Sequence, residues 1–321
     1  MSQHSAPRPA ATSNTANTTA TADIVVVGSV NADLTVNVPR HPEPGETLLG
    51  SGGGITAGGK GANQACAAAK LGGRVALVGA VGRDANATPA TALMREAGVN
   101  LDHLEDVDDV TGLAVITVAA DGENTVLVIP GANALVDATF VRAHRAPIEQ
   151  APLVLLQGEI PADGFAEAVK LAHGRVVINL APVVDVPRDA LLTADPLLAN
   201  EHEAGLILAQ LGLDGSGTPP ELAQRLLDAG VASVVLTLGA AGALVADADG
   251  LRDIASPRVT AVDTVGAGDS FAGALCFRLV AGDSLDDAAA YAARVGAFSV
   301  QRPGAQPSYP NSGDELPGAA R

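Results

Sequence analysis

One acidic residue in the last third of the chain stands beside a run of glycines. The segment Asp263-Thr-Val-Gly-Ala-Gly-Asp269 precedes an apolar stretch with the pattern of an amphipathic helix that starts near Ala267. With Gly266 and Gly268 on either side of Ala267, several backbone N–H groups could converge at the helix N-terminus and hold an anion. The Asp269 carboxylate could take the proton of an attacking hydroxyl, as phosphoryl transfer requires. Alternatively, Asp269 only caps the helix and the glycines form a turn.

A second glycine-rich segment carries a lysine. Gly54 to Lys60 has the spacing of a Walker A phosphate loop, but Gly61 stands where that loop needs a hydroxyl residue for Mg²⁺. We therefore reject the Walker A interpretation. The run Gly59-Lys-Gly-Ala62 can instead bring backbone close to a polyol, with Asn63 offering a donor and an acceptor. The alternative is a tight turn with a solvated lysine.

Polar residues also follow two apolar runs. The first run, Ile24–Val27, is followed by a single glycine, Gly28. A dinucleotide site needs G-x-G-x-x-G at this point, so a dehydrogenase is poorly supported. Asn31 and Asp33 could bond vicinal hydroxyls, or they could form an Asx turn. Glu159 follows a run that ends at Gln157, and ligand contacts gather at the carboxyl ends of strands in a doubly wound sheet.

Two further loops could serve a nucleotide. Asn200-Glu-His-Glu203 follows a short apolar run, and its polar groups could organise Mg²⁺ and phosphate through water, although Asn200 could equally be a helix N-cap. The run Thr237-Leu238-Gly239-Ala240-Ala241-Gly242 lies between two strand-like segments. It could cradle a nucleotide or be only a hairpin connection.

The elements that must position these loops alternate along the chain. Apolar runs without polar alternation predict strands that are buried on both faces of a sheet. They lie at Ile24–Val27, Val75–Val78, Leu153–Leu156, Val176–Ile178, Val234–Leu236 and Ala243–Val245. Helices are predicted between them at about 62–71, 87–97, 163–173, 220–229, 268–281 and 285–301. This order predicts an α/β fold with a doubly wound, mostly parallel sheet.

Two segments interrupt the alternation. Residues 34–57 and 111–130 have the pattern of extended hairpins, with Asp121-Gly122 as a turn. A small β-structure standing off the main sheet would account for both segments. We interpret it as a lid over a cleft; it could also be a subunit interface or an edge extension with no special role.

The charge of the chain argues against one class of partner. There are 36 acidic and 19 basic side chains and a formal charge of −17, whereas nucleic-acid binding depends on clustered Lys and Arg. A nucleotide remains compatible, because helix N-termini and a few cations can hold phosphate in a cleft. Cys66 and Cys276 lie among small apolar residues and are expected to be buried thiols. No two histidines are spaced i, i+4, so no zinc site is expected.

The ends of the chain lack periodic patterns. Residues 1–22 are rich in Ala, Thr, Ser, Asn and Pro and show no apolar segment of a signal peptide, so we expect a disordered tail. Residues 311–321 are expected to fray. No apolar run reaches the ~18 residues of a membrane span. We therefore expect a cytoplasmic protein without a membrane partner. We also expect one folded domain over residues 23–310.

Taken together, six ordered motifs resemble the PfkB carbohydrate kinase family from about Asp23 to Ser308. They are Gly28-Ser-Val-Asn-Ala-Asp33, Pro44-Gly-Glu-Thr47, Gly58-Gly-Lys-Gly-Ala-Asn-Gln64, Asn200-Glu-His-Glu203, Asp263-Thr-Val-Gly-Ala-Gly-Asp269 and Gly304-Ala-Gln-Pro-Ser308. The match is strongest to members that phosphorylate D-ribose. The resemblance implies ATP as phosphoryl donor, D-ribose as acceptor, Mg²⁺, an activating K⁺, and a homodimer formed through the β-lid of residues 34–57 and 111–130.

The same resemblance implies roles for single residues. Asp269 is similar to the base that deprotonates the sugar 5-hydroxyl, and the amides of Gly266, Ala267 and Gly268 are similar to an anion hole. The positions matching sugar contacts are Asn31, Asp33, Gly59, Lys60, Gly61, Ala62, Asn63 and Glu159. Those matching nucleotide contacts are Asn200, Thr237, Leu238, Gly239, Ala240, Ala241, Gly242 and Gly268. Those matching metal and cation contacts are Glu203 for Mg²⁺ and Asp263, Val265, Ser299, Arg302, Gly304 and Ser308 for K⁺.

Two positions depart from the family pattern. Gly158 stands where bulkier residues often precede the acidic residue, and Ala293 stands where a polar nucleotide contact is common. Neither is in the predicted phosphoryl-transfer core. The acceptor remains open to other furanoses and nucleosides, such as deoxyribose, fructose or adenosine, because pocket shape decides it. A non-catalytic sugar-binding regulator is disfavoured, because Asp269 and its glycines are intact.

Overall fold

The computed structural model describes residues 21–318. The predicted disorder of residues 1–20 concerns a segment outside this range. Among the described residues, no helix has both the length and the apolar composition needed to span a membrane.

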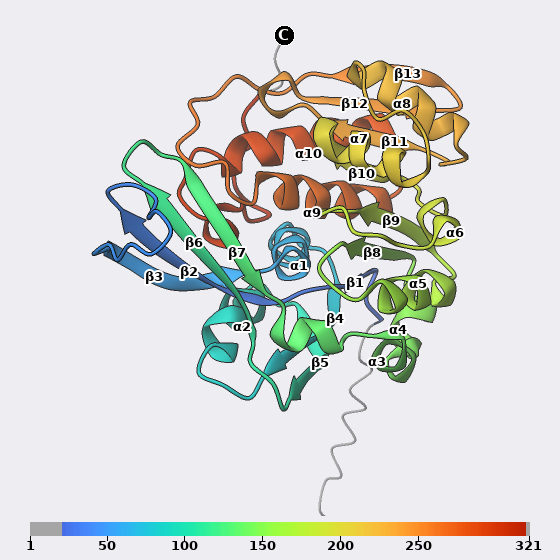
Figure 1. The fold of residues 1–321 in the computed structure, drawn as a ribbon. Helices are drawn as coiled ribbons and strands as arrows, with labels where there is room; N and C mark the ends of the chain where they lie inside the picture. Colours follow the sequence, from blue (N-terminus) through green and yellow to red (C-terminus); the bar gives the residue numbers. More distant parts are fainter. Residues whose placement is uncertain (1–20, 319–321) are drawn as a thin grey trace, which may run out of the picture.

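A nine-stranded sheet forms the centre of the molecule (Figure 1), in the order β13-β12-β11-β10-β9-β8-β1-β4-β5. Neighbours from β5 to β11 pair in parallel, and β11, β12 and β13 pair antiparallel. The strands are β1 Ile24–Val27, β4 Val75–Gly82, β5 Asn100–Val107, β8 Leu153–Gln157, β9 Arg175–Asn179, β10 Leu197–Asn200, β11 Val234–Thr237, β12 Ala243–Asp247 and β13 Gly250–Ile254. The doubly wound, mostly parallel sheet is confirmed.

Helices cover both faces of this sheet. The helices are α1 Lys60–Lys70, α2 Ala87–Glu96, α3 Ala138–Ala143, α4 Arg145–Gln150, α5 Ala162–Leu171, α6 Arg188–Leu191, α7 Glu201–Gln210, α8 Pro219–Asp228, α9 Ala267–Val280 and α10 Leu285–Ser299, with short 3₁₀ turns η1 Gly131–Leu135, η2 Gly239–Ala241 and η3 Gln306–Ser308. One core packs the sheet against α3 to α8, and the other packs it against α1, α2, α9 and α10.

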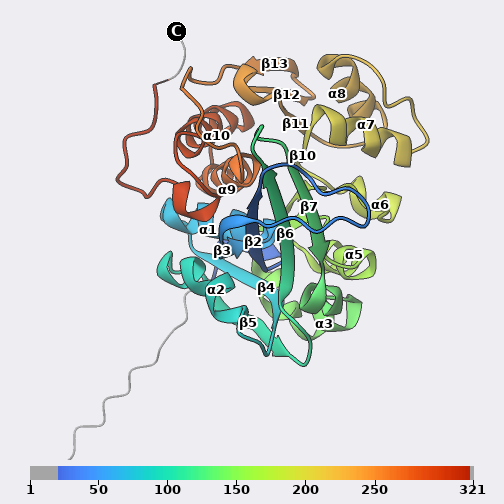
Figure 2. The ribbon, with the colours of Figure 1, turned by 60° about the vertical axis from the view of Figure 1, so that its left-hand side comes forward.

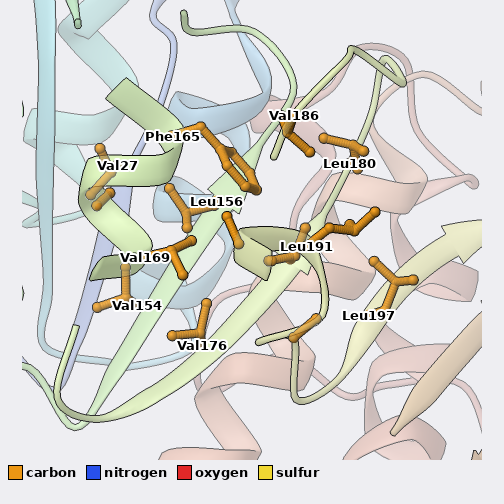
Figure 3. Packing of buried hydrophobic residues seen from close by; sticks show 14 of the residues in the cluster. Val27, Val154, Leu156, Phe165, Val169, Val176, Leu180, Val186, Leu191 and Leu197 are labelled. Carbon is orange, nitrogen blue, oxygen red and sulfur yellow. The ribbon is translucent and has the colours of Figure 1, made fainter. Parts of the chain in front are cut away.

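Strand β1 shows why its sequence is apolar without alternation. Val25 and Val27 enter the first core, whereas Ile24 and Val26 enter the second. Because successive side chains of a strand point to opposite faces, a strand covered on both sides needs an apolar residue at every position. Figure 3 shows the first core, where Phe165 of α5 lies over Leu156 of β8.

A second sheet of four strands stands off the first (Figures 1 and 2), in the order β3-β2-β6-β7. The strands are β2 Asn31–Val38, β3 Ser51–Gly58, β6 Gly112–Ala119 and β7 Asn124–Ile129. β2 pairs antiparallel with β3 and parallel with β6, and β6 and β7 form a hairpin. The predicted small β-structure is confirmed, with β2 starting earlier than expected, at Asn31.

The base of this small sheet is held by one buried amide. Asn133, in η1, accepts a hydrogen bond from Val30 N at 2.9 Å and donates to Val30 O at 3.2 Å and Asn31 Oδ1 at 2.7 Å. A Cβ on Gly112, the first residue of β6, would lie 2.2 Å from both the Asn133 and Asn31 amides. The two strands that leave the main domain here are therefore fixed to η1.

The C-terminal segment differs from the fraying expected for residues 311–321, of which 319–321 lie outside the described range. Arg294 of α10 donates from Nε to Pro317 O at 2.8 Å and from Nη2 to Leu316 O at 3.2 Å. Leu316 also packs against the second core. A side chain far away in the sequence supplies the hydrogen bonds, so the local pattern gave no sign of this order.

Candidate active site

Asp269 lies in the first turn of α9 and is buried, with 7% of its surface exposed. Asn63 Nδ2 donates to its Oδ2 and Gln64 Nε2 to its Oδ1, each at 2.9 Å. Both donors come from α1, which packs against α9. Because α1 begins directly after the Gly58-Gly59 turn, the two glycine-rich segments meet at this carboxylate.

The helix start beside Asp269 needs glycine. Gly266 has φ 70°, and a Cβ there would lie 2.5 Å from Ala305 Cβ and from the Tyr309 hydroxyl. That hydroxyl donates to Gly266 O at 3.1 Å, and burial raises the pKa of Tyr309 well above its usual value, which keeps it protonated. Ala267 N is engaged with Thr264 O at 3.2 Å. A Cβ on Gly268, by contrast, would meet no atom within 4 Å.

The Gly268 amide is therefore better placed than the Ala267 amide to donate to an anion. The Asp269 amide, which follows it in the first turn of α9, is a second possible donor. First-turn N–H groups of a helix have no acceptor within the helix, and the positive end of the helix dipole favours an anion there. The prediction that Ala267 also contributes its amide is not supported by its bond to Thr264.

Lys60 lines the same small cavity as Asp269, with a volume of about 170 Å³. The Asp269 carboxylate raises the pKa of Lys60; burial opposes this effect, and Glu159 and Glu203 add to it. The ammonium group therefore stays charged and can attract an anionic group. The alternative of a solvated surface lysine does not hold.

The loop around Lys60 is fixed to the end of β1. Glu159 Oε2 accepts from Ser29 Oγ at 2.5 Å and from Lys60 N at 3.0 Å. Gly61 N donates to Ser29 Oγ at 3.2 Å, and Ala62 N donates to Ser29 O at 2.9 Å. The amides of Gly61 and Ala62 thus bond Ser29 and hold the loop's shape.

Asp33 is the least satisfied polar group of the site. Its Oδ1 is buried and has no hydrogen-bond partner among the described residues. Burial, with Glu159 and Asp269 adding to it, raises the pKa of Asp33 to about 6. A Cβ on Gly58 would lie 2.1 Å from this carboxylate, so only glycine fits opposite it. A ligand hydroxyl would satisfy the free oxygen.

Two larger cavities adjoin the small one. The first, of about 350 Å³, lies under the small sheet, and its lining includes Asn31, Asn133, Glu159 and Val128 of β7. Asp33 shares the face of Val128, because Asp33 pairs with Ala114 and Ala114 with Val128. Of the predicted polyol contacts, Asn31 and Glu159 line this cavity.

The second cavity, of about 520 Å³, is mostly apolar. Its lining includes Thr237, Gly239, Ala240, Gly242, Gly268, Phe271 and Ala293. The run from Thr237 to Gly242 connects the antiparallel strands β11 and β12, so it is a hairpin connection and a cavity wall together. Leu238 packs instead against the first core, and neither it nor Ala241 lines the cavity. Thr237 and Gly268 line both this cavity and the small one.

Asn200 and Glu203 form a capping box at the start of α7. Glu203 N donates to Asn200 Oδ1 and Asn200 N to Glu203 Oε2, both at 2.8 Å. The helix-cap alternative is therefore confirmed, and both residues also line the small cavity with Asp269.

The predicted cation residues lie near one another at the start of α9, with different side-chain roles. Asp263 accepts from Val265 N at 2.9 Å and Gly304 N at 2.7 Å, which joins the two loops. Ser299 Oγ lies 3.1 Å from Ser270 Oγ, and Ser308 Oγ donates to Ala305 O. The Arg302 guanidinium lies over the Phe298 ring, 4.0 Å from its centroid, so only its backbone could contact a cation here.

Five buried amide side chains near the site were not predicted as site residues: Gln64, Asn133, Gln157, Asn179 and Gln306. Gln64 and Gln306 lie within recognised motifs, and a buried glutamine in the otherwise small and apolar α1 is a signal that could have been read. Asn133 and Asn179 had no such signal.

The departure at Gly158 has a local cause, because a Cβ there would lie 1.9 Å from Pro182 O.

Comparisons with known proteins agree with this geometry. Residues 21–312 match the model of the pfkB family carbohydrate kinases. The chain is 38% identical over 304 residues to a ribokinase of Schizosaccharomyces pombe, covering 90% of this chain and 95% of the relative. It is 33% identical over 294 residues to a deoxyribokinase of Salmonella typhi, covering 90% of this chain and 96% of the relative. A structure of Arabidopsis thaliana ribokinase complexed with ribose and ATP matches with a TM-score of 0.83 and 32% identity. The match covers 91% of this chain and 97% of that structure's chain. The chain belongs to the pfkB family of carbohydrate kinases.

Proposed function

We propose that this chain phosphorylates D-ribose at its 5-hydroxyl with ATP, giving D-ribose 5-phosphate and ADP. The observation that carries the proposal is the position of Asp269. Its buried carboxylate borders the small cavity that shares walls with the apolar cavity, and Lys60 connects it to the polar groups under the small sheet. A base between an acceptor site and a donor site is what phosphoryl transfer needs.

In this proposal the sugar binds under the small sheet. Asn31, Glu159 and the free oxygen of Asp33 accept from its hydroxyls, and the 5-hydroxyl approaches Asp269, which takes its proton. Lys60 and the free amides of Gly268 and Asp269 stabilise the charge on the transferring phosphoryl group. The small sheet acts as a lid that excludes water. The adenine base fits the apolar cavity lined by Phe271 and Ala293.

Mg²⁺ and K⁺ belong to the proposal, and the residues fit both ions. Glu203 places a carboxylate at the small cavity, which suits Mg²⁺ held partly through water. Asp263 holds the loops of Val265 and Gly304 together, so that backbone carbonyls of these loops and of Ser299, Arg302 and Ser308 supply oxygen ligands for K⁺. Bound Mg²⁺ would offset phosphate charge, and K⁺ would add positive charge beside the anion hole.

We also propose that the protein acts in the cytoplasm and as a homodimer formed through the small sheet. Apolar side chains of this sheet are exposed, including Leu127 at 66% and Ile55 at 46%. Exposed apolar side chains gathered on one small sheet favour a partner surface.

An acceptor panel tests the activity. ADP release would be measured with ribose, deoxyribose, fructose, adenosine and pseudouridine, and we expect the highest kcat/KM with ribose. Asp269→Asn should lower kcat at least about 10³-fold, because the isosteric amide cannot take the proton. Deoxyribose is the second candidate, since a deoxyribokinase is among the relatives.

Two results would contradict the assignment. Turnover of another acceptor, with ribose no faster than the Asp269→Asn background, would reject ribose. Equal rates with K⁺ and with a large inert cation would reject the K⁺ site.

A further inference from the structure

The base is held by a chain of amide side chains that extends well beyond the substrate cavities. Asp269 accepts from Asn63 and Gln64, as described above. Gln306 Nε2 donates to Asn63 Oδ1 at 3.0 Å, and Gln157 Nε2 donates to Gln64 Oε1 at 2.7 Å. All five side chains are buried, and Gln64 and Gln306 have no exposed surface.

The charge of Asp269 determines the direction of every bond in this chain. An ionised carboxylate only accepts hydrogen bonds, so Asn63 and Gln64 must turn their NH₂ groups toward it. Their carbonyl oxygens then point away and can only accept. Gln306 must therefore present its NH₂ group to Asn63, because the reversed amide would place two oxygens against each other.

Gln306 makes this bond at a cost elsewhere. Its own Oε1 is buried and has no hydrogen-bond partner among the described residues. An unpaired buried oxygen is unfavourable, and an apolar side chain of the same shape would avoid it. A glutamine at this position therefore makes sense for the hydrogen that it donates to Asn63. Its backbone is fixed as well, because Lys70 Nζ donates to Gln306 O at 3.1 Å.

We propose that Gln306 is a positioning residue for the catalytic base: through Asn63 it orients and polarises the Asp269 carboxylate. The inference rests on the proposed function. Gln306 itself lines none of the three cavities of the site, and its side chain is joined to Asp269 through Asn63. Hydrogen bonds donated to a carboxylate favour its ionised form. The Gln306–Asn63 bond thus keeps the base ready to accept a proton.

The first test compares Gln306→Met with the wild type. Methionine keeps the shape and removes the donor, so we expect kcat to fall about tenfold, the loss of roughly one hydrogen bond, while the KM for ATP changes less than about twofold. Gln301→Met is the matched control, since Gln301 donates only to Ala297 O on the exposed end of α10.

A second variant keeps the idea testable if Gln306→Met does not fold. In Gln306→Glu, a protonated carboxyl can donate to Asn63 and an ionised one cannot. The ratio of variant to wild-type kcat should therefore rise as the pH falls toward the pKa of the introduced carboxyl, which burial raises. A merely structural role predicts a constant ratio.

The outcomes separate the two proposals. An active wild type with unchanged kcat in Gln306→Met, or a constant ratio in Gln306→Glu, would overturn the positioning role alone. A wild type that turns over none of the sugars would overturn the proposed function and this inference with it.

Discussion

At the scale of single residues, the ionised form of Asp33 is unfavourable in the folded protein, because its carboxylate is buried near the carboxylates of Glu159 and Asp269. Its pKa in the folded protein is about 6, above the ordinary value of 3.8. The folded state therefore prefers the protonated form. The stability that this preference contributes is present below about pH 4 and is lost as the pH rises through 6.

We predict that Asp33→Asn removes this pH dependence. Relative to the variant, the wild type should lose up to about 3 kcal/mol of unfolding free energy between pH 4 and pH 7.5. Urea unfolding of both proteins across this range measures the difference. Asp121→Asn, on the exposed turn between β6 and β7, is the control and should follow the wild type. Parallel curves for Asp33→Asn and wild type would show that Asp33 titrates normally.

The residues with chemical roles could be predicted, but their hydrogen-bond partners could not. Asp269 stands in a glycine-rich run whose local pattern indicates an anion site, and Lys60 stands in one whose pattern indicates a polyol loop. The Gln306–Asn63 bond joins residues 243 positions apart. Only the packing of η3 against α1 brings these two amides together, and no local pattern contains that contact.

At the scale of elements, Asn133 connects the small sheet to the main domain. Replacing it with alanine leaves Val30 N, Val30 O and Asn31 Oδ1 without this partner. Because unpaired buried polar groups are unfavourable, we predict that Asn133→Ala lowers the unfolding free energy by about 3 kcal/mol. The KM for the sugar should rise about tenfold, since Asn31 is no longer held in place.

Urea unfolding and initial-rate kinetics check this prediction. Asn124→Ala, on the exposed β7, is the matched control and should change stability by less than about 0.5 kcal/mol. An Asn133→Ala protein with wild-type KM and stability would show that the small sheet does not depend on this amide.

Several of the elements that the sequence missed are polar or short, although the ten-residue α7 was missed as well. All six apolar runs are strands, because burial on both faces leaves no room for polar residues. β5, at the sheet edge, is the polar run Asn-Leu-Asp-His-Leu-Glu-Asp-Val and is half exposed, so it shows no continuous apolar pattern. α3, α4 and α6 have only four to six residues each, too few for a helical period to appear.

At the scale of the whole molecule, one face of the small sheet carries a row of apolar residues. Ile55 pairs with Leu34, Leu34 with Val115 and Val115 with Leu127, so the row crosses all four strands. It lies opposite the face of Asp33 and Val128, and Val128 lines the cavity under the small sheet. One face would thus serve the substrate and the other the second subunit.

We predict that Leu127→Lys converts the dimer to a monomer, because a charge would be buried in the interface. Light scattering after size-exclusion chromatography measures the mass. Leu251→Lys is the control: Leu251 is an exposed leucine of β13, 39% exposed, and its replacement should leave the dimer intact. A monomeric wild type, or a dimer that tolerates both Leu127→Lys and Ile55→Lys, would contradict the proposed interface.

The contact between Tyr309 and Gly266 also has an optical consequence. The chain has no tryptophan and only two tyrosines, and one of them donates its hydroxyl proton to the carbonyl that begins α9. Emission excited in the tyrosine absorption band, beyond that of phenylalanine, therefore comes from Tyr291 and Tyr309. A shift of the anion-hole loop on nucleotide binding would alter the emission of Tyr309, so the protein contains its own fluorophore at the catalytic loop, and ligand titrations need no attached dye.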